Sequence, residues 1–160
     1  MLYETNSTEA TIALGRALAP HLRSGDVILL DGDLGAGKTH FVKGLALGLG
    51  SEADVSSPTF AILNNYALSG GAPAGAAMLN HFDVYRVHEE EEILDLGFEE
   101  IVYGQDLSVI EWSSLIPGIL PEDHLRILIR LGSEPNQRLI SMQWSPTQGE
   151  RSLPDADTGC

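Results

Sequence analysis

The chain has 160 residues, of which 43% are hydrophobic, and its formal net charge is −14. This size and composition are typical of one soluble globular domain. No apolar run is long enough to span a bilayer, and the first residues, 1–4, lack the basic and apolar regions of a secretory signal. The only cysteine is Cys160, which excludes a disulfide within the chain. We therefore expect a cytoplasmic protein with no membrane partner.

Basic residues are too few and too scattered for direct, tight binding to nucleic acid. The chain has 23 acidic residues, and its only lysines are Lys38 and Lys43. Proteins that bind RNA or DNA directly neutralise the phosphates with clustered Lys and Arg. An acidic surface instead suits a protein partner with a basic face, because opposite potentials steer docking.

The first predicted element is an amphipathic helix. Asn6 followed by Glu9 is typical of a capping box, and apolar residues recur at helical spacing over 10–22. We expect this helix to end before the turn at 24–26. The short apolar run 27–30 then predicts a buried strand.

The segment 32–39 follows this strand and matches the pattern G-x-x-x-x-G-K-[ST] in full. Its glycines allow successive backbone N–H groups to point inward and form an anion nest. We expect Lys38 to reach the β- and γ-phosphates of ATP and the Thr39 hydroxyl to ligate Mg²⁺. An accidental glycine-rich turn is disfavoured, because an apolar strand leads in and a predicted helix over 38–49 leads out. The residues expected to surround the phosphates are Gly32, Asp33, Gly35, Ala36, Gly37, Lys38 and Thr39.

Further apolar runs alternate with turns downstream of this helix. The predicted elements are strands over 60–66 and 78–82, an acidic helix over 89–96, a strand over 107–111, and a hairpin from 125–129 and 140–144. Residues 146–160 are rich in Pro and polar residues, and we expect a disordered tail after a single domain over 1–145. Together the elements predict an α/β fold of the P-loop NTPase class. Its form is a three-layer sandwich whose mixed sheet ends in an antiparallel hairpin.

Two acidic residues follow apolar strands and are candidates for catalysis. A P-loop site needs a carboxylate at the end of a neighbouring strand to hold Mg²⁺ and position the attacking water. Asp83 and Glu111 both fit, because strand carboxyl ends meet at the nucleotide. A solvated acid at a strand end is the simpler alternative for either residue, and spacing alone does not decide which one contacts the metal.

Each of two further residues has two alternative interpretations, one functional and one structural. Thr59 lies in the segment 57–60, where P-loop switches place a threonine that senses the γ-phosphate and the metal. A turn with a cap residue explains the same segment. Trp112, beside Glu111, is either a residue that stacks near the nucleotide or an ordinary core aromatic.

Four blocks together resemble the TsaE (YjeE) family, the ATPase of tRNA threonylcarbamoyladenosine biosynthesis in bacteria. They are 32–39, Ser57-Pro58-Thr59-Phe60, His81-Phe82-Asp83-Val84-Tyr85-Arg86, and Glu111-Trp112. The resemblance covers residues 5–131, and the order of the blocks is far more specific than the P-loop alone.

The resemblance implies a role for each matching residue. Lys38 and the loop amides would bind the triphosphate of ATP, Thr39 and Glu111 would hold Mg²⁺, and Asp83 would support hydrolysis. Thr59 would be the switch residue, and the segment near Thr11 would contribute to the adenine pocket. The implied partners are the TsaD and TsaB proteins, which modify the adenosine next to the anticodon, so this chain would meet tRNA only through that complex.

Three alternative functions for the chain are a small-molecule kinase, a GTP-binding switch and a nucleotide-dependent scaffold. A small-molecule kinase usually carries an arginine-rich lid, whereas only Arg86 lies near the motifs. A GTP-binding switch would need an Asn-Lys-x-Asp motif, which the chain lacks. A nucleotide-dependent scaffold that does not hydrolyse ATP stays open, because intrinsic hydrolysis is often slow until a partner completes the site.

Overall fold

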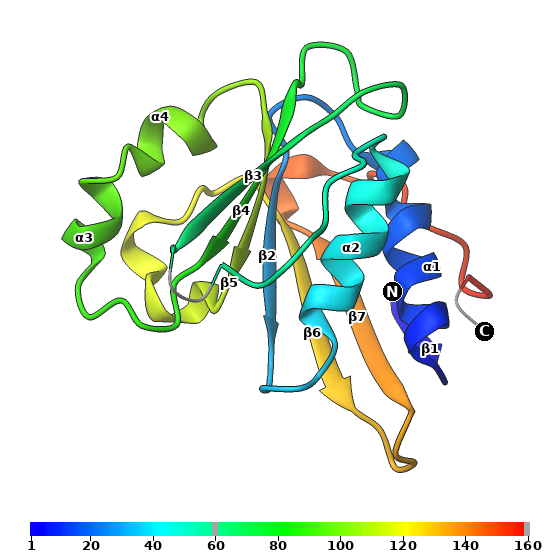
Figure 1. The fold of residues 1–160 in the computed structure, drawn as a ribbon. Helices are drawn as coiled ribbons and strands as arrows, with labels where there is room; N and C mark the ends of the chain where they lie inside the picture. The colour runs from blue at the N-terminus through cyan, green and yellow to red at the C-terminus, as the bar shows by residue number, and fades with distance from the viewer. Residues whose placement is uncertain (59–60, 159–160) are drawn as a thin grey trace.

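In the residues that the computed structural model describes, 1–58 and 61–158, seven strands form one mixed sheet in the order β1-β7-β6-β2-β5-β4-β3 (Figure 1). The four central strands β4, β5, β2 and β6 run parallel to one another, while β1–β7, β6–β7 and β3–β4 are antiparallel pairs. This confirms the mixed sheet and the C-terminal antiparallel hairpin, but the sheet does not end in that hairpin, because β1 pairs with β7 and forms the edge. The strands are β1 (Leu2–Thr5), β2 (Val27–Gly32), β3 (Leu63–Ala67), β4 (Met78–Asp83), β5 (Leu107–Glu111), β6 (Leu125–Leu131) and β7 (Arg138–Trp144).

Helices cover both faces of this sheet. α1 (Thr8–Leu18) and α2 (Lys38–Gly48) lie on one face, and the short helices α3 (Glu90–Leu94) and α4 (Phe98–Val102) lie on the other (Figure 1). Single 3₁₀ turns join several of these elements: η1 (Ala19–His21), η2 (Ser113–Leu115), η3 (Pro117–Ile119) and η4 (Pro146–Gln148). None of the helices in the described ranges combines the length and the apolar character needed to cross a bilayer.

The central strand β2 is buried on both faces, and its side chains supply two separate hydrophobic cores. Ile28 and Leu30 belong to the core beneath α1 and α2. Val27 and Leu29 point the other way, into the core beneath α3 and α4. This alternation follows from the two-residue period of a strand, and it explains why the sequence of β2 is continuously apolar.

α1 and α2 touch through their backbones, which fixes α1 beside the start of α2. A Cβ atom added at Gly44 of α2 would lie only 1.9 Å from the carbonyl oxygen of Ile12 in α1. The close approach brings Thr11 to the amino-terminal end of α2, where its Cγ2 would be 3.8 Å from a Cβ at Gly37. The helix pair therefore carries residues of the N-terminal segment to the glycine-rich loop.

The predicted start of the first helix is wrong by one residue. Ser7, not Asn6, is the N-cap: its Oγ accepts a hydrogen bond from the backbone N–H of Ala10 at 3.0 Å. Both residue types favour this position, so sequence pattern alone separates them poorly. A capping box does exist at α3, where the side chains of Glu89 and Glu92 bond each other's backbone N–H groups.

Other differences are confined to short elements. β1, α4 and the 3₁₀ turns were not predicted, and the acidic helix is shorter than the predicted 89–96. β3 begins at Leu63 rather than near Phe60. Residues 59–60 and 159–160, which include Thr59 and Cys160, lie outside the described residues.

The segment 146–158 differs from the disordered tail expected from its composition, because it packs against the domain. The Arg151 guanidinium forms two hydrogen bonds of 2.8 Å with the Asp26 carboxylate and lies 3.7 Å from the Trp144 ring centroid. The Tyr3 hydroxyl donates a hydrogen bond of 2.8 Å to the carbonyl of Pro154. Specific contacts of this kind are invisible to a composition-based criterion.

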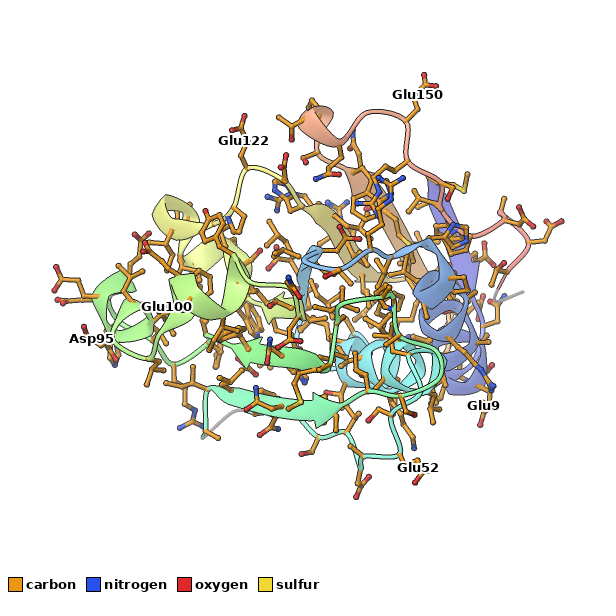
Figure 2. The ribbon with its side chains drawn as sticks, turned by 90° about the horizontal axis from the view of Figure 1, so that it is seen from above. Glu9, Glu52, Asp95, Glu100, Glu122 and Glu150 are labelled. Atoms are coloured by element: carbon orange, nitrogen blue, oxygen red, sulfur yellow. The ribbon has the colours of Figure 1, made fainter. Side chains whose placement is uncertain are left out.

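The negative charge is spread over several sides of the molecule. Figure 2 shows acidic side chains that project outward from α1, from the loop after α2, from the α3–α4 layer and from the loops beside β6 and β7. The labelled examples are Glu9, Glu52, Asp95, Glu100, Glu122 and Glu150.

Candidate functional site

The carboxyl ends of three neighbouring parallel strands meet at one edge of the sheet. Asp83 at the end of β4 is the register partner of Glu111 at the end of β5, and Leu30 of β2 lies opposite Glu111 from the other side. A cavity of about 520 Å³ opens at this edge. It is lined by Ser7, Thr8, Thr11, Leu34, Gly35, Ala36, Gly37, Lys38, Thr39, His40, Ser57, Asp83, Tyr85, Arg86, Glu111, Trp112, Asn136 and Arg138.

The glycine-rich loop between β2 and α2 forms one wall of the cavity. Gly37 is the N-cap of α2 with φ of 104°, a left-handed conformation that residues with a side chain rarely adopt. A Cβ at Gly32 would lie 2.4 Å from the carbonyl oxygen of Ile129 in β6, so only glycine fits there. The loop is therefore shaped by its glycines, and it turns the positive end of the α2 dipole toward the cavity.

Lys38 is the cation at the centre of the site, and only 7% of it is exposed. Its Nζ donates hydrogen bonds to the carbonyl oxygens of Gly32 at 2.5 Å and Asp33 at 3.0 Å. Burial lowers the pKa of this ammonium, while the nearby carboxylates, with Glu111 and Asp83 foremost, act in the opposite direction. An incoming polyphosphate would meet a cation that is already held in place.

The two candidate carboxylates are both buried and hydrogen-bonded. Asp83 is 5% exposed; its Oδ2 accepts from the Ser57 hydroxyl and its Oδ1 from the Tyr85 backbone N–H, each at 3.0 Å. Glu111 is 2% exposed, and its Oε2 contacts Nε2 of His81. Neither residue is therefore a solvated acid at the end of a strand, the simpler alternative that the sequence left open.

Trp112 lines the cavity and also packs against the core beneath α3 and α4. Its φ of 60° is left-handed, which turns the chain sharply after Glu111. A tryptophan held in this strained conformation is uncommon and is often found at functional sites. The indole ring lies 4.5 Å from Nζ of Lys38 and 4.7 Å from the centroid of the Tyr85 ring.

The structure brings most of the predicted residues together. The loop residues 35–39, Asp83, Glu111, Trp112 and Thr11 all line the cavity. Gly32 and Asp33 contribute through carbonyl oxygens that hold Lys38. Thr59, the predicted switch residue, lies outside the described residues, and its role stays a prediction.

Arg138 is a site residue that the sequence analysis missed. It lies in β7, and its guanidinium donates hydrogen bonds to the carbonyl oxygens of Ala36 at 3.0 Å and Gly35 at 3.4 Å. The contact holds these two carbonyls on the side of the loop that faces β7. A single arginine after a turn carries no recognisable signal, and a separation of 102 residues from Ala36 hides the pairing.

The oxygen ligands in the cavity fit a magnesium ion better than a metal held by nitrogen or sulfur. Thr39 supplies a hydroxyl, and Asp83 and Glu111 supply carboxylates, on the same cavity. Across residues 1–58 and 61–158, no group of three His, Cys, Asp or Glu is arranged to hold a metal ion. Mg²⁺ prefers such oxygen donors, and it usually takes one or two protein ligands together with phosphate and water oxygens.

Comparison with known proteins gives a consistent result. A family model described as Threonylcarbamoyl adenosine biosynthesis protein TsaE matches residues 5–140. The chain is 40% identical over 137 residues to the tRNA threonylcarbamoyladenosine biosynthesis protein TsaE of Bacillus subtilis, covering 86% of this chain and 82% of that protein. It is 39% identical over 135 residues to the protein of the same name from Treponema pallidum, covering 84% and 95% respectively.

A solved structure is also similar to this chain over most of its length. The crystal structure of YdiB from Bacillus subtilis matches with a TM-score of 0.75 and 34% sequence identity, covering 92% of this chain and 87% of that chain. The resemblance first drawn from the motif blocks is thus confirmed. The chain belongs to the TsaE family of threonylcarbamoyl adenosine biosynthesis proteins.

Proposed function

We propose that this protein is a Mg-dependent ATPase, with a P-loop NTPase fold, that serves the synthesis of threonylcarbamoyladenosine in tRNA. The observation that carries the proposal is the shared cavity of the glycine-rich loop, Lys38 and two buried carboxylates. This arrangement combines an anion nest, a central cation and acids at the strand ends, as ATP hydrolysis requires. The relatives named for this biosynthesis supply the biological context.

Binding of the triphosphate follows from the loop and α2. The backbone N–H groups of 33–39 and the positive end of α2 are suited to the phosphate oxygens. Lys38 would exchange its bonds to the loop carbonyls for bonds to the β- and γ-phosphates. Arg138 restrains the carbonyls of Gly35 and Ala36, which helps to keep the neighbouring amides turned toward the ligand. Thr11, on the α1 side of the cavity, is a candidate contact of the adenosine.

The carboxylates take different roles in this proposal. Thr39 and Glu111 would hold the magnesium ion, which when bound neutralises charge on the phosphates. Asp83, held by Ser57 and the Tyr85 amide, would orient the attacking water. Thr59 would sense the γ-phosphate and the metal.

Protein partners complete the proposal. The net charge of −14 disfavours direct binding to tRNA and favours a partner with a basic face. We expect the partners to be TsaD and TsaB, in the cytoplasm, with tRNA contacted only through their complex. ATP hydrolysis would be weak until these partners dock, as in other P-loop enzymes that are completed in trans.

The decisive experiment measures ATP hydrolysis and tRNA modification in parallel. The protein is assayed alone, with a TsaB–TsaD pair, and with that pair plus tRNA. We expect hydrolysis to rise with the pair and modification to continue beyond one turnover. Modification that continues with no ATP hydrolysis would contradict the ATPase and favour a nucleotide-dependent scaffold.

A matched pair of variants tests the site in the same assay. Glu111→Gln should lower turnover by about 100-fold or more while changing ATP affinity far less, because the carboxylate would hold the magnesium ion that neutralises phosphate charge during the reaction. Glu122→Gln removes an exposed acid and should match the wild type. A Glu111→Gln protein with normal turnover would show that the metal assignment is wrong.

A further inference from the structure

His81 is a buried imidazole on β4, in the layer directly behind the cavity, and its exposure is 0%. Its register partners are Val109 of β5 and Asn64 of β3. Glu111 and Tyr66 each lie two residues beyond those partners, so all three side chains point to the same face of the sheet. These strands lie side by side in Figure 1.

The His81 ring is hydrogen-bonded at both nitrogen atoms. Nε2 contacts Oε2 of Glu111, and Nδ1 lies 3.2 Å from the Tyr66 hydroxyl. That hydroxyl donates to the carbonyl oxygen of Ser56 at 3.0 Å. Nδ1 is thus within hydrogen-bond distance of a hydroxyl that also reaches the loop. The contacts run without a break from His81 through Tyr66 to Ser56.

The bond to Glu111 completes this chain. A contact between Nε2 and a carboxylate oxygen needs a proton between the two atoms, which makes the hydrogen bond charge-assisted. Such bonds are short and directional, so they set the orientation of the carboxylate. The ring that orients Glu111 is itself oriented by Tyr66.

The same short loop also reaches the second carboxylate. Ser57, the residue after Ser56, donates its hydroxyl to Oδ2 of Asp83 at 3.0 Å. Two consecutive loop residues are therefore bonded to both acids, one directly and one through Tyr66 and His81.

We propose that His81 is a positioning residue that, together with Tyr66, couples the loop at 56–57 to Glu111. The loop then orients both carboxylates at once, Asp83 through Ser57 and Glu111 through this relay. The inference rests on the proposed ATPase function, and it gives His81 and Tyr66 a role that neither the motif blocks nor the comparisons assign. Side chains that orient a ligating group typically affect activity by about 10–100-fold when they are replaced.

Three substitutions separate the links of the relay. His81→Gln places an amide nitrogen near the position of Nε2, so it keeps the contact to Glu111 and loses the contact to Tyr66. His81→Asn places its amide nitrogen near Nδ1 and has the opposite effect. Tyr66→Phe removes the hydroxyl alone. Tyr103→Phe, at an exposed tyrosine of the α4 end, makes the same chemical change away from the site and serves as the control.

The variants are compared by kcat, by ATP affinity from calorimetry without magnesium, and by thermal midpoint, with TsaB and TsaD added for kcat. We expect ATP affinity to stay within about threefold, since the relay does not touch the phosphate loop. His81→Asn should lower kcat by about 100-fold, while Tyr66→Phe and His81→Gln should each lower it by about tenfold. Tyr103→Phe should match the wild type.

Each result bears on the proposal. Wild-type kcat in Tyr66→Phe would overturn the coupling to the loop, and this mild variant decides the matter even if the His81 variants fail to fold. Equal losses of kcat and ATP affinity would also overturn it, because they indicate general damage. A wild-type protein with no ATP turnover would overturn the proposed function as well, whereas an active wild type with unaffected variants overturns only the relay.

Discussion

The Lys38 ammonium lies over the indole ring of Trp112, with Nζ 4.5 Å from the ring centroid. The same ring packs against Tyr85. A cation this close to an aromatic face interacts with the ring quadrupole and perturbs its electronic environment. A ligand that draws Lys38 toward its phosphates would therefore change the surroundings of the indole.

We predict that ATP changes the tryptophan fluorescence of the protein and that Trp112 is the source. The chain has two tryptophans, which makes the assignment direct. Trp144→Phe should keep the ATP-dependent change. Trp144 packs against Arg151, and neither residue lines the cavity. Trp112→Phe should abolish the change. A signal that persists in Trp112→Phe would place the perturbation elsewhere.

The pH dependence of ATP binding should reflect the buried ammonium of Lys38. Burial lowers its pKa below the ordinary 10.5, although the neighbouring carboxylates partly offset this effect. Only the charged form binds phosphate strongly, so ATP affinity should fall as the pH rises through this lowered pKa. Hydrogen bonds to charged groups contribute about 1.5–3 kcal/mol, which corresponds to a loss of roughly 10- to 100-fold in affinity.

Titration by calorimetry from neutral pH to pH 10.5 measures this loss. Lys38→Arg provides the comparison, because a guanidinium stays charged throughout the range even if its shape lowers the affinity. Its affinity should be nearly flat with pH. A wild-type protein whose affinity is equally flat would show that Lys38 does not carry the ionic contact.

The glycine-rich loop and its place between a strand and a helix could be predicted from sequence, because its residues are consecutive and their chemistry is local. Asp83 and Glu111 could be predicted as well, since an apolar run followed by an acid marks the end of a strand. The roles of Arg138 and His81 could not be predicted, because they depend on strand register and on partners far along the chain. The packing of the segment around Arg151 could not be predicted for the same reason, because composition does not reveal a single well-placed ion pair.

The contact between α1 and α2 should tolerate no side chain at Gly44. Alanine favours a helix over glycine by about 1 kcal/mol, but its Cβ would overlap the Ile12 carbonyl and push α1 away. Overpacking of this kind costs about 1–3 kcal/mol or more, so we expect a net loss of unfolding free energy. Urea denaturation measures the change.

Gly70→Ala is the matched control for this substitution. A Cβ at Gly70 would meet no atom within 4 Å, so its stability should stay within about 0.5 kcal/mol of the wild type. If Gly44→Ala is as stable as this control, the helices are free to separate, and the close contact does not hold α1 beside the loop.

The ion pair between Arg151 and Asp26 should hold the C-terminal segment to the domain. Their side chains are 5% and 9% exposed, so losing the guanidinium leaves a carboxylate largely out of water. Removing one partner of a buried pair typically costs about 3–5 kcal/mol, and we expect Arg151→Met to lower the unfolding free energy by about 3 kcal/mol. Adding Asp26→Asn should recover part of the loss, because the isolated charge is then gone.

Glu150→Gln alters an exposed neighbour of Arg151 and is the control; it should change stability by less than about 0.5 kcal/mol. Denaturant curves in which Arg151→Met and Glu150→Gln coincide would mean that the segment adds nothing to the stability of the domain.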